Sequence, residues 1–354
     1  MKTFRDPLFV SNGHVEYGEY ELAGAEERIY YEVRGSGNRN VLLIMGMWAT
    51  CRHFEQLATQ LAANGCRVLS YDSRGIGRSG STHGSLEHMD TPSDTSSDRI
   101  RLLSDRGGRH AMTERQTTPS LAADAAQLAG HVFGGGGEKV HVFGISLGGM
   151  VAQKLAANAA TLGFRIASLH LAATTRCPVR IFAPLLPRFL GTLPLSIFQL
   201  LVAFFFRNAT NKVKLCDKIL AQNFAKSFLK SVHPDDPDHR TFEEIYSEKW
   251  LADFNGFWTL FDRHAMANQL SAAASHCLTF LEIRSIIDSH IPVTVLVAGK
   301  DQVIDTQSQE SLAKSLNSRV VRSREGHVMA DEHDYSLLLN SLLENISAGD
   351  NDFI

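Results

Sequence analysis

Short apolar runs typical of buried strands alternate along this chain with segments of helical periodicity. The apolar runs lie at 40–44, 67–71, 140–143, 166–172, 293–298 and 319–322. Helical patterns occupy 53–64, 121–132, 150–157 and 335–346. Because strands that alternate with helices form parallel sheets through right-handed crossovers, the pattern predicts an α/β fold with a mostly parallel sheet. Residues 17–34 alternate differently, in the manner of an N-terminal hairpin.

Two regions interrupt this alternation. Residues 81–116 are rich in Ser, Thr, Asp, Arg and His and show little periodicity, which favours a mobile surface insertion. From 177 to 284 the strand pattern stops and helical patterning replaces it. We therefore expect a core made of residues 1–176 and 285–354, with a helical segment at 177–284 inserted into it.

The composition is that of an ordinary soluble protein with a large core. Apolar residues make up 44% of the 354 positions and charged residues 21%. The net charge of −3 shows no nucleic-acid signature, so we expect no nucleic-acid partner. The five scattered cysteines lack CxxC spacing and favour free thiols over disulfides or a zinc site. The first residues carry no apolar signal segment, and we expect a cytoplasmic location.

One serine lies in a strand–turn–helix pattern. The apolar run 140–143 leads into Gly144-x-Ser146-x-Gly148, and an Ala-rich helical segment follows. A turn this tight leaves no room for side chains two residues before and after the serine. It would present Ser146 at the carboxyl edge of the sheet, where helix amides favour developing negative charge. Ser146 is therefore the candidate nucleophile, although the bare motif also occurs by chance in glycine-rich chains.

A serine needs a base to take its proton, and the base works best when a carboxylate orients it. His327 follows a late strand behind Gly326, and Asp301 follows the strand before it. The carboxyl ends of parallel strands meet at one edge, so these residues should lie close to Ser146. His333 remains an alternative base and Asp305 an alternative acid.

The motifs together resemble the α/β-hydrolase superfamily. Asp72-x-Arg74-Gly75-x-Gly77-x-Ser79 after a strand, the serine turn, the acid loop and the late histidine occur in that family's order. The resemblance implies an α/β-hydrolase fold: a mostly parallel central sheet flanked by helices, with 177–284 as an inserted helical cap. In relatives the aspartate and arginine of the first motif mainly brace loops beside the site. The resemblance implies catalysis without a metal or organic cofactor.

The same resemblance implies an oxyanion hole of two backbone N–H groups. One is the amide of Leu147, directly after the nucleophile. The other comes from the loop after strand 40–44, where many relatives carry His-Gly and this chain carries Met45-Gly46. By position, the Met47 amide is the expected donor. Trp48 lines an acyl pocket or simply packs; the sequence leaves both open.

The region around 148–153 and the length of the insertion resemble monoglyceride-lipase and carboxylesterase members, and residues 283–295 resemble plant and protist hydrolases of that type. Relatives that attack carbon by displacement carry Asp at the nucleophile position, so Ser146 favours acyl transfer. We expect a serine hydrolase for a small-molecule carboxylic ester. Thioester cleavage, C–C bond hydrolysis on the same triad and a non-catalytic ligand-binding role remain alternatives.

The first part of the insertion favours an apolar substrate. Residues 176–214 carry six Arg or Lys side chains and no acidic one, and residues 191–206 are uncharged. Sixteen residues are fewer than the ~20 that a membrane-spanning helix needs. The segment either roofs an apolar acyl tunnel or touches a membrane surface through residues 180–214.

Overall fold

The computed structural model describes residues 15–23, 28–80, 115–135, 137–178, 212–234, 236–248, 263–328 and 335–351. Its centre is one eight-stranded sheet with the order β1-β2-β4-β3-β5-β6-β7-β8. The strands are β1 (Val15–Glu21), β2 (Arg28–Arg34), β3 (Arg39–Ile44), β4 (Cys66–Tyr71), β5 (Lys139–Ile145), β6 (Arg165–Ala172), β7 (Val293–Ala298) and β8 (Arg319–Ser323). All pairs are parallel except β1–β2 and β2–β4. The expected α/β class with a mostly parallel sheet is confirmed.

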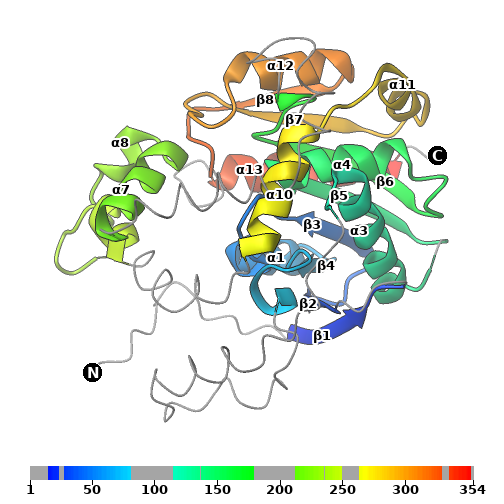
Figure 1. Cartoon of the computed structure of the whole chain (residues 1–354), viewed down its shortest axis with the longest axis horizontal. Coiled ribbons are helices and arrows are strands. Elements are labelled where there is room, and N and C mark those ends of the chain that lie inside the picture. The colour runs from blue at the N-terminus through cyan, green and yellow to red at the C-terminus, as the bar shows by residue number, and fades with distance from the viewer. Residues whose placement is uncertain are drawn as a thin grey trace.

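Helices cover both faces of the sheet (Figure 1). On one face lie α1 (Glu55–Ala63) and α13 (Tyr335–Asn351); on the other lie α3 (Thr118–Phe133), α4 (Leu147–Ala157), α11 (Phe280–Asp288) and α12 (Thr306–Ser315). Side chains alternate along β3: Val41 and Leu43 pack toward α1 and α13, whereas Leu42 packs into the opposite cluster. This two-sided burial is why the strands read as continuous apolar runs.

Element boundaries differ from the expected ones where polar residues begin a helix. The helix expected from 121 begins at Thr118, because Thr117 and Ser120 form a reciprocal capping box and Pro119 occupies the first turn. The helix expected from 53 begins as a 3-10 turn, η1 (Cys51–Phe54), and becomes α-helical at Glu55. These residues lack the apolar periodicity on which the expectation rested.

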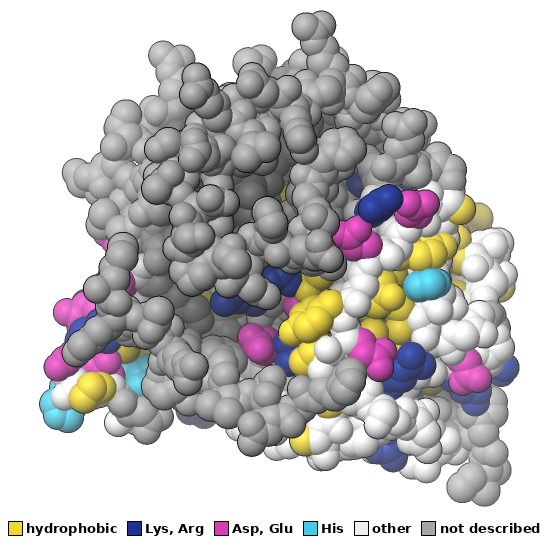
Figure 2. Space-filling model, turned by 90° about the horizontal axis from the view of Figure 1, so that it is seen from below, with side chains coloured by type: hydrophobic (Ala, Val, Ile, Leu, Met, Phe, Trp, Pro, Cys, Tyr) yellow, Lys and Arg dark blue, Asp and Glu magenta, His cyan; other side chains and the backbone are white. Residues whose placement is uncertain are grey.

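The hairpin of β1 and β2 forms one end of the sheet, at the bottom of Figure 1. Arg28 of β2 forms ion pairs with Glu19 and Glu21 of β1. On the described part of the face seen from this end, hydrophobic side chains lie among acidic and basic ones (Figure 2). Charged side chains on an edge strand oppose pairing with another chain.

Between β6 and β7 the described elements are all helical: α7 (Lys212–Asn223), α8 (Lys226–Leu229), α10 (Arg263–Ser275) and α11. Nearly all of the insertion expected at 81–116, and most of the membrane-contact segment expected at 180–214, lies outside the described residues. The division into core and cap stays a prediction. In the part of the chain that is described, no helix is long and apolar enough to cross a membrane.

Candidate functional site

Ser146 occupies the sharp turn between β5 and α4, with a φ of 55° that places this non-glycine residue at positive φ. A Cβ at Gly144 would collide with the carbonyl oxygen of Gly148, and one at Gly148 would collide with that of Ile44. The two glycines flanking the serine are therefore required by close backbone approach.

The backbone of Ser146 is held on both sides. Its N–H donates to the carbonyl of Ala172 at 3.0 Å, and its carbonyl accepts the Thr174 hydroxyl at 2.7 Å. Ala172 is the last residue of β6, the neighbouring strand, and Thr174 follows two residues later. The sheet thus maintains a backbone conformation that costs about 1–3 kcal/mol locally.

The side chains of Ser146, His327 and Asp301 form a continuous hydrogen-bonded chain. Ser146 Oγ lies 2.9 Å from His327 Nε2, and His327 Nδ1 lies 2.8 Å from Asp301 Oδ2. An ionised carboxylate only accepts, so Nδ1 carries the proton and Nε2 is free to accept from the serine hydroxyl. The His327 side chain is 8% exposed and the Asp301 side chain is fully buried. This arrangement can transfer the serine proton to the imidazole.

The carboxylate of Asp301 receives three further donors. Its Oδ1 accepts the N–H groups of Val303 and Ile304 at 2.7 and 2.9 Å. Its Oδ2 accepts the Gln309 side-chain amide at 2.9 Å. These donors orient the carboxylate toward His327. The sequence carried no signal for Gln309, which lies on α12 and is completely buried.

The alternative acid lies elsewhere. Asp305 caps α12, where its carboxylate accepts the Ser308 N–H at 2.8 Å and the Ser308 hydroxyl at 2.6 Å. The alternative base, His333, lies outside the described residues.

The loop after β3 passes directly over the serine. A Cβ at Gly46 would lie 3.3 Å from Ser146 Cβ. Met47 packs against one of the core clusters, and Leu147 is the buried first residue of α4. An N–H in the first turn of a helix has no acceptor within that helix. The oxyanion role of the Met47 and Leu147 amides stays a prediction, as does the substrate-binding role of Trp48.

Loops beside the site are braced by the motif after β4. The buried Asp72 carboxylate accepts the N–H groups of Cys51 and Arg78 at 2.8 and 3.0 Å. Burial raises the pKa of this carboxyl, and the two amide bonds oppose the rise. Arg74 donates to Asp124 of α3 through Nε at 3.1 Å. Asp72 and Arg74 therefore connect loops rather than reach Ser146.

Residues of α7 and α8 contact the histidine and acid loops. Val328 donates its N–H to the Asn223 carbonyl at 3.0 Å, and Lys300 Nζ donates to Ser227 Oγ at 2.8 Å. Val328 also packs against a cluster built on Phe224 and Phe228. This helical segment therefore lies beside both partners of Ser146.

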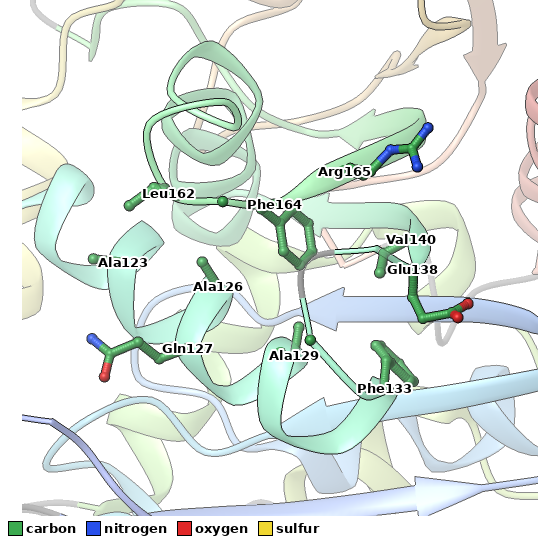
Figure 3. A pocket seen from close by; sticks show the side chains of 13 residues that line it. Ala123, Ala126, Gln127, Ala129, Phe133, Glu138, Val140, Leu162, Phe164 and Arg165 are labelled. Atoms are coloured by element: carbon green, nitrogen blue, oxygen red, sulfur yellow. The ribbon is translucent and has the colours of Figure 1, made fainter.

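A separate pocket of about 250 Å³ opens at the opposite end of the strands, near the start of β5 and β6 (Figure 3). Phe133 of α3, Val140 and Phe164 line it, with Glu138 and Arg165 beside them. Its described lining contains no serine, cysteine or histidine. It is not part of the Ser146 site.

Comparisons with known proteins agree with the fold. The sequence profile of the alpha/beta hydrolase fold family matches residues 39–334. No curated protein matched the chain.

Among solved structures, a hydrolase from Pseudomonas aeruginosa PA01 is 19% identical, with a TM-score of 0.63 over 96% of this chain and 100% of that one. An esterase from Exiguobacterium antarcticum is 17% identical, with a TM-score of 0.60 over 91% and 96% of the two chains. A thermophilic esterase from Thermogutta terrifontis is 16% identical, with a TM-score of 0.62 over 94% and 99%. At these identities the structures show a shared fold. Since the profile match covers most of the sequence, the chain belongs to the α/β hydrolase fold family.

Proposed function

We propose that this protein is a serine hydrolase that cleaves a carboxylic ester with an apolar acyl group, and that Ser146, His327 and Asp301 are its catalytic residues. The observation that carries the proposal is the hydrogen-bonded chain from Ser146 Oγ through His327 to the buried carboxylate of Asp301. The esterase structures of the same fold support the reaction class.

The proposed reaction proceeds in two halves. His327 Nε2 takes the proton of Ser146 as Oγ attacks the ester carbonyl, and Asp301 stabilises the resulting imidazolium. His327 then returns the proton to the departing alcohol, which leaves Ser146 acylated. Water attacks the acyl-enzyme with His327 again as the base, and the acid is released. The Leu147 and Met47 amides are the proposed donors to the oxyanion of both tetrahedral intermediates.

An apolar substrate fits the residues around the serine. The loop over Ser146 contributes Met47 and Trp48. The histidine loop contributes Val328, which packs against the cluster built on Phe224 and Phe228. A cytoplasmic location and contact of residues 180–214 with a membrane surface are further proposals that rest on sequence alone.

Fluorophosphonate labelling read by mass spectrometry tests the nucleophile. We expect label on Ser146 in wild type, and no label in Ser146→Ala or His327→Ala. Ser285→Ala serves as the matched control. Ser285 lies on the exposed side of α11, and among the described residues its hydroxyl bonds only the Ala157 carbonyl. Folded wild-type protein that takes no label would contradict the proposal and favour a ligand-binding role.

Substrate panels then separate the reactions open to an activated serine. We expect p-nitrophenyl esters to be hydrolysed with kcat/KM rising from acetyl toward longer acyl chains. Preference for acyl-thioesters or for a C–C substrate over every ester would replace the ester proposal while keeping Ser146 as the nucleophile.

A further inference from the structure

Helix α10 reaches back to the loop that covers Ser146. Gln269 Oε1 accepts the backbone N–H of Trp48 at 2.7 Å, and the Met266 carbonyl accepts the Trp48 indole N–H at 3.0 Å. Gln269 is completely buried and Met266 is 4% exposed. Residues three apart share one face of a helix, so one turn of α10 holds Trp48 through both its backbone and its ring.

Trp48 needs such support. Its φ of 60° lies in the left-handed region, which a bulky residue rarely adopts. A conformation of this kind costs about 1–3 kcal/mol and persists only where surrounding groups determine it. The contacts with α10 are therefore needed for this loop to keep its conformation.

The loop in question is the one that approaches the nucleophile. Gly46, two residues before Trp48, lies against Ser146. Because the Trp48 N–H is bonded to Gln269, it is not available to a substrate oxygen. The preceding N–H is that of Met47, the donor that the sequence predicts for the oxyanion. The orientation of the peptide between Met47 and Trp48 depends on the Trp48 conformation that α10 holds.

We infer that Gln269 is a positioning residue for the oxyanion-binding loop, acting through the Trp48 N–H so that the Met47 N–H faces the oxyanion. This inference rests on the proposed function. It assigns a role in ester cleavage to a helix in the last part of the insertion expected at 177–284, and Gln269 lies 221 residues along the chain from Trp48.

The neighbouring residue Asn268 provides the matched control. It is also completely buried, and its Oδ1 accepts the Gln116 N–H at 3.3 Å, on a segment that leads into α3. Substituting Asn268 therefore removes a buried amide from the same turn of α10 without touching the loop over Ser146. A purely structural role of α10 would make the two positions equivalent.

The test compares Gln269→Leu, Gln269→Glu and Asn268→Leu in the full chain, with rates normalised to the fraction of fluorophosphonate-reactive enzyme. For Gln269→Leu we expect kcat on a p-nitrophenyl ester to fall about 10- to 100-fold with KM within about threefold, as for loss of an interaction made in the transition state. Affinity for an alkyl trifluoromethyl ketone, whose serine adduct carries an oxyanion, should fall in parallel. Gln269→Glu keeps the acceptor and should recover most of kcat, whereas Asn268→Leu should stay within about threefold of wild type.

Equal kcat values for folded Gln269→Leu and Asn268→Leu, in an active wild type, would overturn the role of Gln269 alone. An unlabelled, inactive wild type would instead overturn the proposed function. If Gln269→Leu does not fold, Trp48→Phe removes the indole bond to Met266 and keeps an aromatic ring, and we expect a loss in kcat of about 3- to 10-fold with KM unchanged. A Trp48→Phe enzyme with wild-type kcat would contradict the dependence of the loop on α10.

Discussion

Ser146, at the candidate site, and Trp48, in the loop beside it, are both non-glycine residues with positive φ, and they are held in different ways. Ser146 is held by its neighbours in the sheet, through the Ala172 carbonyl, the Thr174 hydroxyl and backbone packed too closely for side chains. Trp48 is held by two hydrogen bonds that it donates to α10, more than two hundred residues away in sequence. One side of the site is thus formed by the core, and the other depends on a helix within the insertion expected at 177–284.

The difference bears on how each side responds to change. Backbone packed against backbone has no way to relax, so the serine turn should tolerate almost no substitution. Single side-chain hydrogen bonds contribute about 0.5–1.5 kcal/mol each, so the Trp48 loop should change its geometry without unfolding the protein. We therefore expect substitutions around Ser146 to affect stability, and those around Trp48 to affect mainly kcat.

The largest expected effect comes from replacing Asp301, the proposed acid, which supports the Ser146 side of the site. Asp301→Asn should lower kcat by about 10³- to 10⁴-fold, because an amide no longer dictates the His327 tautomer. The matched control is Asp305→Asn, which alters only the cap of α12 and should retain kcat within about twofold while lowering the unfolding free energy slightly. Steady-state kinetics on both variants check this; a loss confined to Asp305→Asn would reverse the assignment of the acid.

The turn at Ser146 should break with Gly148→Ala. The added Cβ meets the Ile44 carbonyl, and we expect a loss of about 3 kcal/mol or more in unfolding free energy, measured by urea titration. Gly130→Ala is the control: it lies inside α3 with open space around the Cβ and should stabilise the protein by up to about 1 kcal/mol. Equal effects of the two substitutions would show that close packing at the turn does not matter.

Acid should destabilise both regions through buried histidines. Burial lowers the pKa of His170, on β6, and that of His276, just after α10, to about 3 in each case. At pH 5 both imidazoles stay neutral in the folded protein, whereas the unfolded chain, with pKa values near ~6.5, binds protons. Stability is therefore lost as pH falls below about 6.5, by about 2 kcal/mol per histidine at pH 5.

Urea titrations at pH 7 and pH 5 measure this loss. His170→Gln and His276→Asn keep a polar atom near Ser341 and Thr118 respectively, and each should remove about 2 kcal/mol of the pH dependence. A variant whose pH dependence equals that of wild type would show that the pKa of its histidine does not change on folding.

The smallest expected effect comes from Thr174→Val, which tests whether a hydrogen bond at the serine turn contributes to the reactivity of Ser146 as well as to stability. Thr174→Val removes the hydroxyl bonded to the Ser146 carbonyl and should cost about 1 kcal/mol of stability. Thr294→Val removes a comparable buried bond, to Asn345, far from the site and should cost a similar amount. Only Thr174→Val should slow fluorophosphonate labelling; identical labelling rates would show that this bond does not position the nucleophile.

The sequence alone was sufficient for much of the fold and for the serine turn. The sequence pattern identified every parallel strand. Most of these strands are buried on both faces, so apolar residues predominate in them, whereas β8, with Arg319 and Arg322 exposed, was identified from its two valines. The Gly144–Gly148 pattern located Ser146, since the glycines that the turn requires lie within five residues of sequence. Asp301 and His327 could be placed beside Ser146 because the carboxyl ends of parallel strands share one edge.

Only the tertiary structure shows which of Asp301 and Asp305, four residues apart after the same strand, contacts His327. The chain turns so that Asp301 accepts the Val303 and Ile304 amides while pointing at His327, and Asp305 begins α12. Gln309 and Gln269 were missed for a related reason. Each is a buried polar residue on a helix, and what it contacts depends on how that helix packs, which no local pattern of residues encodes.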